Sequence, residues 1–398
     1  MLSKLLLLLI SDNKNMQQTD TKNAIQNSSR SSSSTSNMNQ NKKHGDTVLV
    51  VNPKSSSGST GEGWEDLYIK IKEAFGETPE VAFTKKAGDG TTIATRFLKK
   101  GFKKIVAIGG DGTINEVANG FFFLKNNEQN SHIQDAVGSS DKNNNTDHND
   151  NDNKTNHIPR PPRLEPINSE AVMGLIPSGT RNVLAKSLDL PEEIMECYQN
   201  FIKGKPTKID VISATVTDQS NHSKVYTRIF LNAAEIGIGG EIIEKAKKIR
   251  EKVKSRIVST VASLISTVPN YESNLCEILI DDDRRRAIVT KMTMCVIANG
   301  KYLGGGFRAA PKASISDGLL DIVILKESSN LEMIENFLKL RDDNSTNEGD
   351  VFYKQAKKVS IKSKEEDEKD ITVTIDGEPI GILPATFQVL QNALTVRM

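Results

Sequence analysis

Several features that define a protein class are scarce in this sequence. Its 398 residues include only three cysteines, Cys197, Cys276 and Cys295, scattered and odd in number. Neither a disulfide framework nor a zinc site is therefore indicated, and a reducing compartment fits. The five histidines are dispersed, which leaves no candidate metal cluster or catalytic dyad. The net charge is +1, so there is no general attraction to nucleic acid, which is not an expected partner.

The sequence also lacks an apolar run long enough to span a bilayer. The Leu-rich residues 1–10 are too short, and no small-residue cleavage site follows them. Three interpretations of residues 1–10 stay open: a weak signal sequence, a peripheral membrane contact, or translation from an upstream start codon. Residues 11–43 are rich in Ser, Asn, Gln and Thr and cannot bury enough apolar surface to fold. We expect a disordered tail over 1–45 and a cytoplasmic protein, with peripheral membrane contact left open.

The most informative stretch runs from Lys104 to Phe121. Residues 105–108 have the composition of a buried strand. Three glycines in the next four positions, 109–112, permit close backbone approaches, and helical spacing of apolar residues begins after them. We interpret Thr113 and Glu116 as a capping box. Strand, glycine loop and helix N-terminus together are typical of a phosphate site, although a plain tight turn stays open.

Two more loops follow predicted strands. The strand Thr47–Val51 ends in a polar loop, 52–58, whose hydroxyls and amides could face a phosphate. The strand 172–176 ends in a second Gly-Thr turn, 177–182. Open α/β sheets bind ligands at the carboxyl ends of their strands, so two such loops indicate a ligand site more strongly than one loop does. A Walker-type P-loop is absent.

The remaining chain divides into an insertion and a second domain. Residues 125–166, rich in Asn, Asp, Lys and His, predict a disordered insertion in an α/β domain over 46–205. Alternating strands predict an antiparallel sandwich or barrel-like domain over 206–398. Eight strands are expected there: 208–216, 226–235, 274–281, 287–298, 318–325, 359–362, 371–375 and 387–390.

One helical region, 240–267, interrupts these strands. It has an apolar stripe and a basic face from Lys245 to Arg256. A domain-capping helix with a solvated basic face is the favoured interpretation, and docking to anionic lipid headgroups is the alternative.

The string Gly109-Gly110-Asp111-Gly112-Thr113 resembles the nucleotide-binding signature shared by diacylglycerol kinases, related bacterial lipid kinases, sphingosine kinases and NAD kinases. Four further blocks resemble the lipid kinase branch, and the likeness covers most of 47–398. They are Asn52-Pro53 with its serines, Gly179-Thr180-x-Asn182, the glycine triplet 304–306 with Asp317-Gly318, and Asp376-Gly377-Glu378. One or two extra serines before Gly58 leave the register of the first loop's hydroxyls open.

This resemblance implies a fold and an activity. The fold is an N-terminal Rossmann-like nucleotide-binding α/β domain followed by an antiparallel β-sandwich domain, with the active site in the cleft. The activity is a Mg²⁺-dependent transfer of the ATP γ-phosphoryl group to a lipid hydroxyl. An NAD kinase, or a non-catalytic lipid- or nucleotide-binding regulator, are the alternatives.

The resemblance also assigns roles to residues. Glu378 would be the general base, and Asp111 would act from the opposite domain, through Mg²⁺ that bridges the phosphates and by assisting deprotonation. Asp317, with backbone carbonyls at Ser314 and Leu319, would hold a structural Mg²⁺. The implied nucleotide-binding residues are Asn52, Pro53, Lys54, Ser55, Ser56, Thr84, Gly109, Gly110, Asp111, Gly112, Thr113, Ile114, Asn115 and Thr180.

The expected partner is a lipid substrate at the membrane surface, with anionic lipids at Lys245 to Arg256 as the alternative given above. Whether the protein forms a homodimer stays open. So does the acceptor, for which diacylglycerol, a sphingoid base, an isoprenoid or archaeol-type alcohol and phosphatidylglycerol are the candidates.

Overall fold

Four strands from the first part of the chain form a parallel sheet in the order β2-β1-β3-β6. The computed structural model describes residues 46–75, 78–125, 158–253, 256–303, 308–339, 351–364 and 370–398. The strands are β1 (Thr47–Val51), β2 (Glu80–Phe83), β3 (Lys104–Gly109) and β6 (Val172–Pro177). β1, β3 and β6 are apolar runs buried along almost their whole length, as expected of strands covered on both faces.

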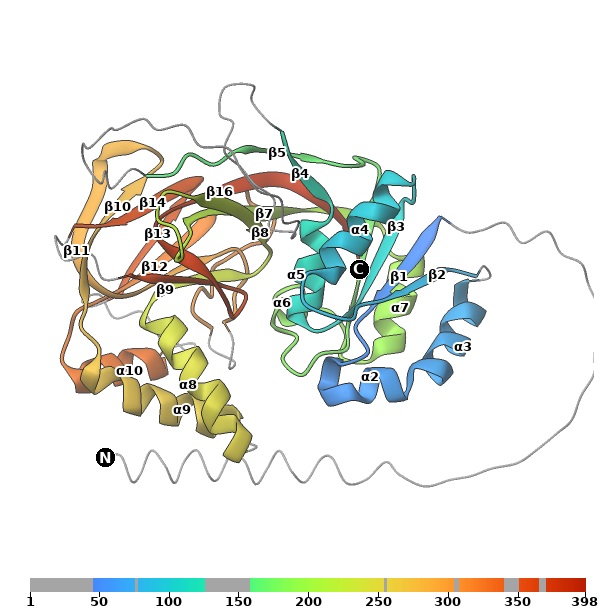
Figure 1. The fold of residues 1–398 in the computed structure, drawn as a ribbon, viewed down its shortest axis with the longest axis horizontal. Helices are drawn as coiled ribbons and strands as arrows, with labels where there is room; N and C mark the ends of the chain where they lie inside the picture. The colour runs from blue at the N-terminus through green and yellow to red at the C-terminus, as the bar shows by residue number, and fades with distance from the viewer. Residues whose placement is uncertain are drawn as a thin grey trace, which may run out of the picture.

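Helices cover both faces of this sheet (Figure 1). Val48 and Val50 pack with residues of α4 and α5, whereas Leu49 and Val51 point to the other face and pack with residues of α3 and α7. The bounds of these helices are α3 (Trp64–Phe75), α4 (Asp89–Lys99), α5 (Asp111–Asn119) and α7 (Ile194–Lys203). The alternation in β1 therefore builds the three layers of the α/β domain.

The second part of the chain forms the expected antiparallel sandwich. Its strands are β7 (Pro206–Thr217), β8 (Val225–Phe230), β9 (Ala233–Gly237), β10 (Asn274–Ile280), β11 (Asp283–Ala298), β12 (Leu320–Lys326), β13 (Val351–Ala356), β14 (Lys358–Ser363), β15 (Thr372–Ile375) and β16 (Glu378–Arg397). Their inward side chains form one core around Phe230 and Phe387. This arrangement confirms the predicted fold class.

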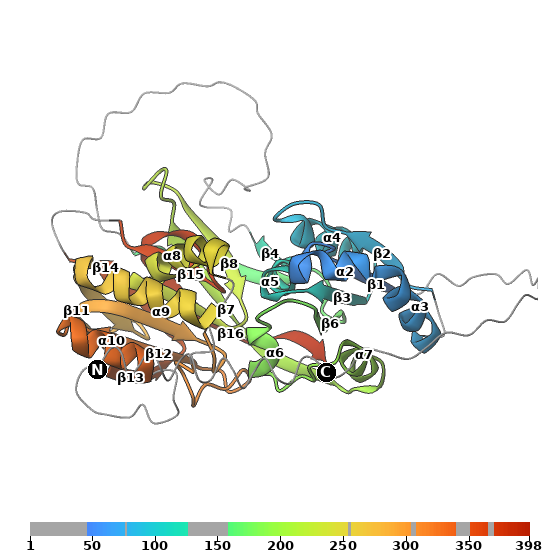
Figure 2. The ribbon, with the colours of Figure 1, turned by 90° about the horizontal axis from the view of Figure 1, so that it is seen from below.

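Three helices cover the outer face of this sandwich (Figure 2). They are α8 (Ile238–Lys252), α9 (Arg256–Thr267) and α10 (Asn330–Lys339), and a short 3₁₀ turn (Val268–Asn270) follows α9. Ile242, Leu264 and Met333 from these helices form a separate buried cluster with side chains of β11 and β12. In the part of the chain that the structure describes, no helix has the length and apolar character to cross a membrane.

Strand β16 joins the two parts. It is 20 residues long and runs antiparallel to β7, and its last residues pair in parallel with β6 through Val396↔Met173 and Arg397↔Gly174. The final residues therefore pack against the first domain. Because backbone pairing continues from one part to the other, it fixes how their loops face each other.

Some predicted elements were wrong in extent. The predicted strand 226–235 is two strands, β8 and β9, because the chain breaks around Asn232, whose side chain is occupied by a hydrogen bond to Tyr302 O. The predicted strand 387–390 is only a part of β16, and β13 was not predicted. The helical region 240–267 is two helices, α8 and α9, and residues 254–255 between them lie outside the described residues.

The predicted disordered insertion was also too wide. Its last residues form β5 (Arg163–Pro166), which pairs with β4 (Phe122–Lys125). Pro159 O accepts a hydrogen bond from the Thr386 hydroxyl, and Leu164 packs against the core of the α/β domain. These contacts with distant residues order a segment whose composition alone is polar. Residues 126–157 lie outside the described residues, as do the tail 1–45 and the glycine triplet 304–306.

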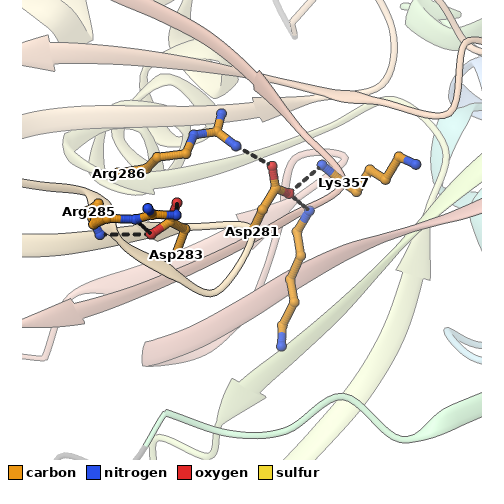
Figure 3. A network of polar contacts seen from close by, with 6 residues as sticks. Asp281, Asp283, Arg285, Arg286 and Lys357 are labelled. Carbon is orange, nitrogen blue, oxygen red and sulfur yellow. Dashed lines mark hydrogen bonds and ion pairs between the residues drawn. The ribbon is translucent and has the colours of Figure 1, made fainter.

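A charged network anchors the hairpin of β10 and β11 (Figure 3). Asp281 accepts hydrogen bonds from the backbone N–H groups of Lys357 and Lys358 at 2.8 and 3.0 Å and from the Arg286 side chain at 2.7 Å. Burial acts to raise the pKa of Asp281, but these hydrogen bonds outweigh it and the pKa is lowered. The hairpin tip is thereby tied to the turn between β13 and β14.

Candidate active site

Two glycine loops meet where β3 and β6 end. Helix α5 begins at Asp111 with Gly110 as its N-cap, and Ser178 N donates to Gly109 O at 2.9 Å. A Cβ on Gly179 would lie 2.4 Å from Gly110 Cα, so the two backbones can approach this closely only because residue 179 is a glycine. The predicted loops are therefore adjacent, with the N-terminus of α5 beside them.

The polar loop after β1 joins the same group. It contains a 3₁₀ turn (Ser55–Gly58) and α2 (Ser59–Glu62). Asn52 Nδ2 donates to Thr113 Oγ1 at 2.9 Å, and the Ser55 and Ser178 hydroxyls lie 3.1 Å apart. Ser55 is buried and its hydroxyl also donates to Asn52 O. Its contacts within the protein thus hold the loop in place.

The other predicted nucleotide-binding residues lie around these loops. Thr84 is buried and follows β2 directly. Lys54 and Thr180 are exposed, and Ser56 has a positive φ of 52°. The Ile114 side chain is buried in the core, and its backbone N–H donates to Gly110 O. Ile114 therefore has a structural role in α5.

The predicted capping box was wrong. Thr113 is the third residue of α5, and the N-cap, Gly110, makes no side-chain hydrogen bond. The Glu116 carboxylate instead accepts from the N–H groups of Gly88 and Gly90 at 2.8 and 2.9 Å, at the N-terminus of α4. A carboxylate satisfies free N–H groups at any helix start that it can reach, and here the helix it reaches is its neighbour.

Asp111 faces a pocket between the two domains. One of its carboxylate oxygens, Oδ1, accepts a hydrogen bond from Leu184 N at 3.1 Å, in the short helix α6 (Val183–Ser187). Among the described residues, no group donates to its Oδ2. The pocket walls come from both parts of the chain and are Asp111, Asn115, Arg181, Val183, Leu184, Leu231, Asn232, Ala233, Glu235, Ile243, Leu303, Asp376 and Gly377.

Asn115 and Asp376 connect the domains at the back of this pocket. Asn115 Nδ2 donates to Asp376 Oδ2 at 2.7 Å and to Ile229 O at 3.2 Å. Ala233 N donates to Asp376 Oδ1 at 3.1 Å. Burial, and more weakly the nearby charge of Asp111, raise the pKa of Asp376 to about 6, against the opposing effect of its hydrogen bonds. Asn115, expected to bind nucleotide, therefore also holds α5 against the sandwich.

Glu378 lies against the glycine loop. It is exposed at the start of β16, directly after the Asp376-Gly377 turn, where both residues have positive φ. A Cβ on Gly112 would lie 3.3 Å from Glu378 Oε1. The two residues with predicted catalytic roles, from opposite halves of the chain, thus lie at one loop, because Glu378 is close to Gly112, the neighbour of Asp111.

The predicted structural metal site lies in the turn before β12. Asp317 is exposed, and its Oδ1 accepts from Leu319 N at 3.0 Å. Its oxygen donors, together with the carbonyls of Ser314 and Leu319, are of the hard type that Mg²⁺ prefers. Within the described ranges no three His, Cys, Asp or Glu side chains group as a metal site, so carbonyls and water would supply most ligands here.

Sequence reasoning missed several residues that build this region. Asp210 is fully buried and accepts from Gly318 N at 2.6 Å and Asn392 N at 2.7 Å, which fixes the turn of the predicted metal site. Asn119 bonds both backbone groups of Ile229 and so strengthens the domain contact. Glu235 lies in the pocket wall. The only signal for these residues was a polar side chain inside a predicted strand or helix, which does not indicate its partner.

Comparison with known proteins identifies the family. Residues 46–214 match the model of the diacylglycerol kinase catalytic domain, and residues 232–398 match that of the YegS C-terminal NAD kinase beta sandwich-like domain. The chain thus consists of a diacylglycerol kinase catalytic domain followed by a YegS-type C-terminal domain. The enzyme is therefore a kinase, and its relatives support a lipid kinase.

Relatives and solved structures agree with this assignment. A diacylglycerol kinase of Staphylococcus saprophyticus is 27% identical over 352 residues, 87% of this chain and 93% of that protein. One of Staphylococcus aureus strain RF122 is 26% identical over 87% of this chain and 90% of that protein. A crystal structure of a diacylglycerol kinase from Bacillus anthracis str. Sterne has a TM-score of 0.57 at 22% identity, covering 89% of this chain and 97% of that one, and shows the shared fold.

Proposed function

We propose that this kinase transfers the γ-phosphoryl group of ATP to the hydroxyl of a lipid, with Mg²⁺ bound, and that diacylglycerol, on which its relatives are named, is among its acceptors. The observation that carries the proposal is the convergence of Asp111 and Glu378 on one glycine loop, beside a partly apolar pocket. Phosphoryl transfer depends mainly on positioning and on neutralising charge, which this arrangement supplies.

In this mechanism the N-terminus of α5 and the glycine backbone hold the nucleotide phosphates. Asp111 Oδ2, which no described residue engages, would bind Mg²⁺, and the ion would neutralise charge on the phosphates. Glu378 accepts the proton of the lipid hydroxyl as its oxygen attacks the γ-phosphorus and ADP leaves.

The apolar part of the pocket suits the lipid. Val183, Leu184, Leu231 and Leu303 contribute aliphatic walls next to the Asp111 carboxylate. A lipid headgroup that enters here brings its hydroxyl to the rim while its chains extend toward the outside. Since the walls come from both domains, correct assembly of the two is required for acceptor binding.

The test is transfer of γ-labelled phosphate from ATP to each lipid of a panel, with NAD as an additional acceptor. Wild-type protein should phosphorylate at least one lipid alcohol in the presence of Mg²⁺ and none after chelation with EDTA. Labelling of NAD alone would favour an NAD kinase. Nucleotide binding with no transfer to any acceptor would favour a regulator and would contradict the proposal.

We further propose that α8 contacts anionic lipids at the membrane surface. Lys247, Lys248 and Lys252 are exposed on it, and Val253, which follows it, is 38% exposed. Exposed basic side chains on one helix, followed by an exposed apolar residue, suit the edge of an anionic bilayer. Wild type should sediment with phosphatidylglycerol vesicles more than with phosphatidylcholine vesicles, and Lys248→Glu with Lys252→Glu should remove the difference. Equal sedimentation of wild type with both vesicles would contradict this docking.

A further inference from the structure

Glu235 is a buried carboxylate that the proposed mechanism does not use. It lies on β9, its residue is 8% exposed, and it lines the pocket that also contains Asp111. Within the part of the chain that the structure describes, no group donates a hydrogen bond to it or pairs with it. Its oxygens are not among the fully enclosed unpartnered atoms of the described structure and are therefore open to the pocket, where a donor on a bound molecule can replace water as their partner.

The neighbours of Glu235 leave room for its carboxylate. A Cβ on Gly239 would lie 2.7 Å from Glu235 Oε2. Gly239 is in the first turn of α8, and any larger residue there would meet the carboxylate, so the glycine leaves this space open. Thr374 lies directly opposite Glu235 on β15 and its side chain is therefore on the same face. Its buried hydroxyl also lacks a hydrogen-bond partner in the described structure.

The charges around the pocket indicate what binds there. Three carboxylates line it, those of Asp111, Asp376 and Glu235, against one guanidinium, that of Arg181. A molecule that contributes a hydrogen-bond donor is therefore better matched to Glu235 than one that contributes only acceptors. A donor that carries positive charge is matched best, because it forms a charge-assisted hydrogen bond with the Glu235 carboxylate.

We propose that Glu235 binds a second hydrogen-bond donor on the acceptor lipid, next to the hydroxyl that is phosphorylated, and so selects acceptors that carry one. The proposal rests on the lipid kinase function above and names the class of acceptor. A 1,2-diacylglycerol has one hydroxyl and no second donor. A monoacylglycerol offers a second hydroxyl, and a sphingoid base offers an ammonium group.

The experiment measures kcat/KM of wild type, Glu235→Gln and Gly239→Ala with these three lipids in mixed micelles. Wild type should prefer the donor-bearing acceptors, and Glu235→Gln should lower that preference relative to diacylglycerol by roughly 10- to 100-fold, most for the ammonium. Gly239→Ala, which keeps the charge but displaces the carboxylate, should act in the same direction. Glu65→Gln, an exposed glutamate on α3, is the matched control and should change nothing.

The outcomes separate this inference from the kinase function. An unchanged preference in both variants, or a wild type that prefers diacylglycerol, would overturn the role of Glu235 while leaving the kinase intact. If no lipid is phosphorylated, the proposed function fails instead. In that case, the binding of short-chain analogues of the same three lipids, measured by calorimetry, decides the role of Glu235. If the proposal is right, the donor-bearing analogues bind wild type more tightly than they bind Glu235→Gln.

Discussion

Replacing Glu235 by glutamine should change how the stability of the protein depends on pH. Burial, with a smaller opposing effect from the Arg181 charge, raises the pKa of Glu235 from its ordinary value of 4.5 to about 7. Between these values the folded protein keeps a proton that the unfolded chain has released. The contribution of Glu235 to the free energy of unfolding therefore falls as pH rises from 4.5 to about 7, and it stays constant at higher pH.

The magnitude follows from the size of the pKa change. Each pKa unit corresponds to about 1.4 kcal/mol, so the folded protein loses on the order of 3 kcal/mol between pH 4.5 and 7 because of Glu235. Glutamine has nearly the same shape and does not titrate. The free energy of unfolding of Glu235→Gln should therefore equal that of wild type near pH 4.5 and exceed it by an amount of this order at pH 8.

Urea unfolding followed by circular dichroism at pH 5, 6, 7 and 8 measures this difference. Titrating groups that do not interact with Glu235 are present in both proteins and cancel in the comparison, whereas Asp376, whose charge helps to raise the pKa of Glu235, contributes to the measured difference. Glu65→Gln, which replaces an exposed carboxylate on α3, is the matched control in the same measurement. A constant difference between wild type and Glu235→Gln at all four pH values would refute the reasoning.

Four other changes test the rest of the structure. Glu378→Gln should lower turnover by roughly two to four orders of magnitude, with nucleotide affinity retained in a binding assay; wild-type turnover would leave Asp111 the better candidate for the base. Asp111→Asn should abolish transfer in the same assay while its melting temperature stays near that of wild type, because the amide still accepts from Leu184 N; a large loss of stability would contradict this. Asp281→Ala should lower the free energy of unfolding, measured in urea at pH 7, by about 1 to 3 kcal/mol. The loss should be smaller as pH falls below about 4, because the lowered pKa of Asp281 means that the carboxylate stabilises the fold most when it is ionised. An equal loss at all pH values would be inconsistent with an ionised network. Deleting residues 126–157 and joining β4 to β5 with a Gly-Ser linker should leave kinase activity nearly unchanged, because loop closure depends weakly on length; inactivity of a folded variant would assign these residues to the site.

Local patterns in the sequence determined much of the fold. The strand, glycine loop and helix start around Asp111 were predicted within a residue or two, because each depends on neighbours a few positions away. The alternating runs of the second domain likewise predicted most strands of the sandwich. The resemblance of Asp376-Gly377-Glu378 to the lipid kinases added what periodicity does not contain, the expectation that Glu378 lies across a cleft from Asp111.

Only the tertiary structure decided which polar groups meet. Glu116 caps α4 and not its own helix, and Asn115 bonds Asp376, 261 residues away. Glu235 sits in a strand without a visible signal, and it becomes a buried, unpartnered carboxylate only when β9, β15 and α8 pack together. Periodicity reports which face of an element is buried. The identity of the partner depends on how distant segments approach, which no single segment specifies.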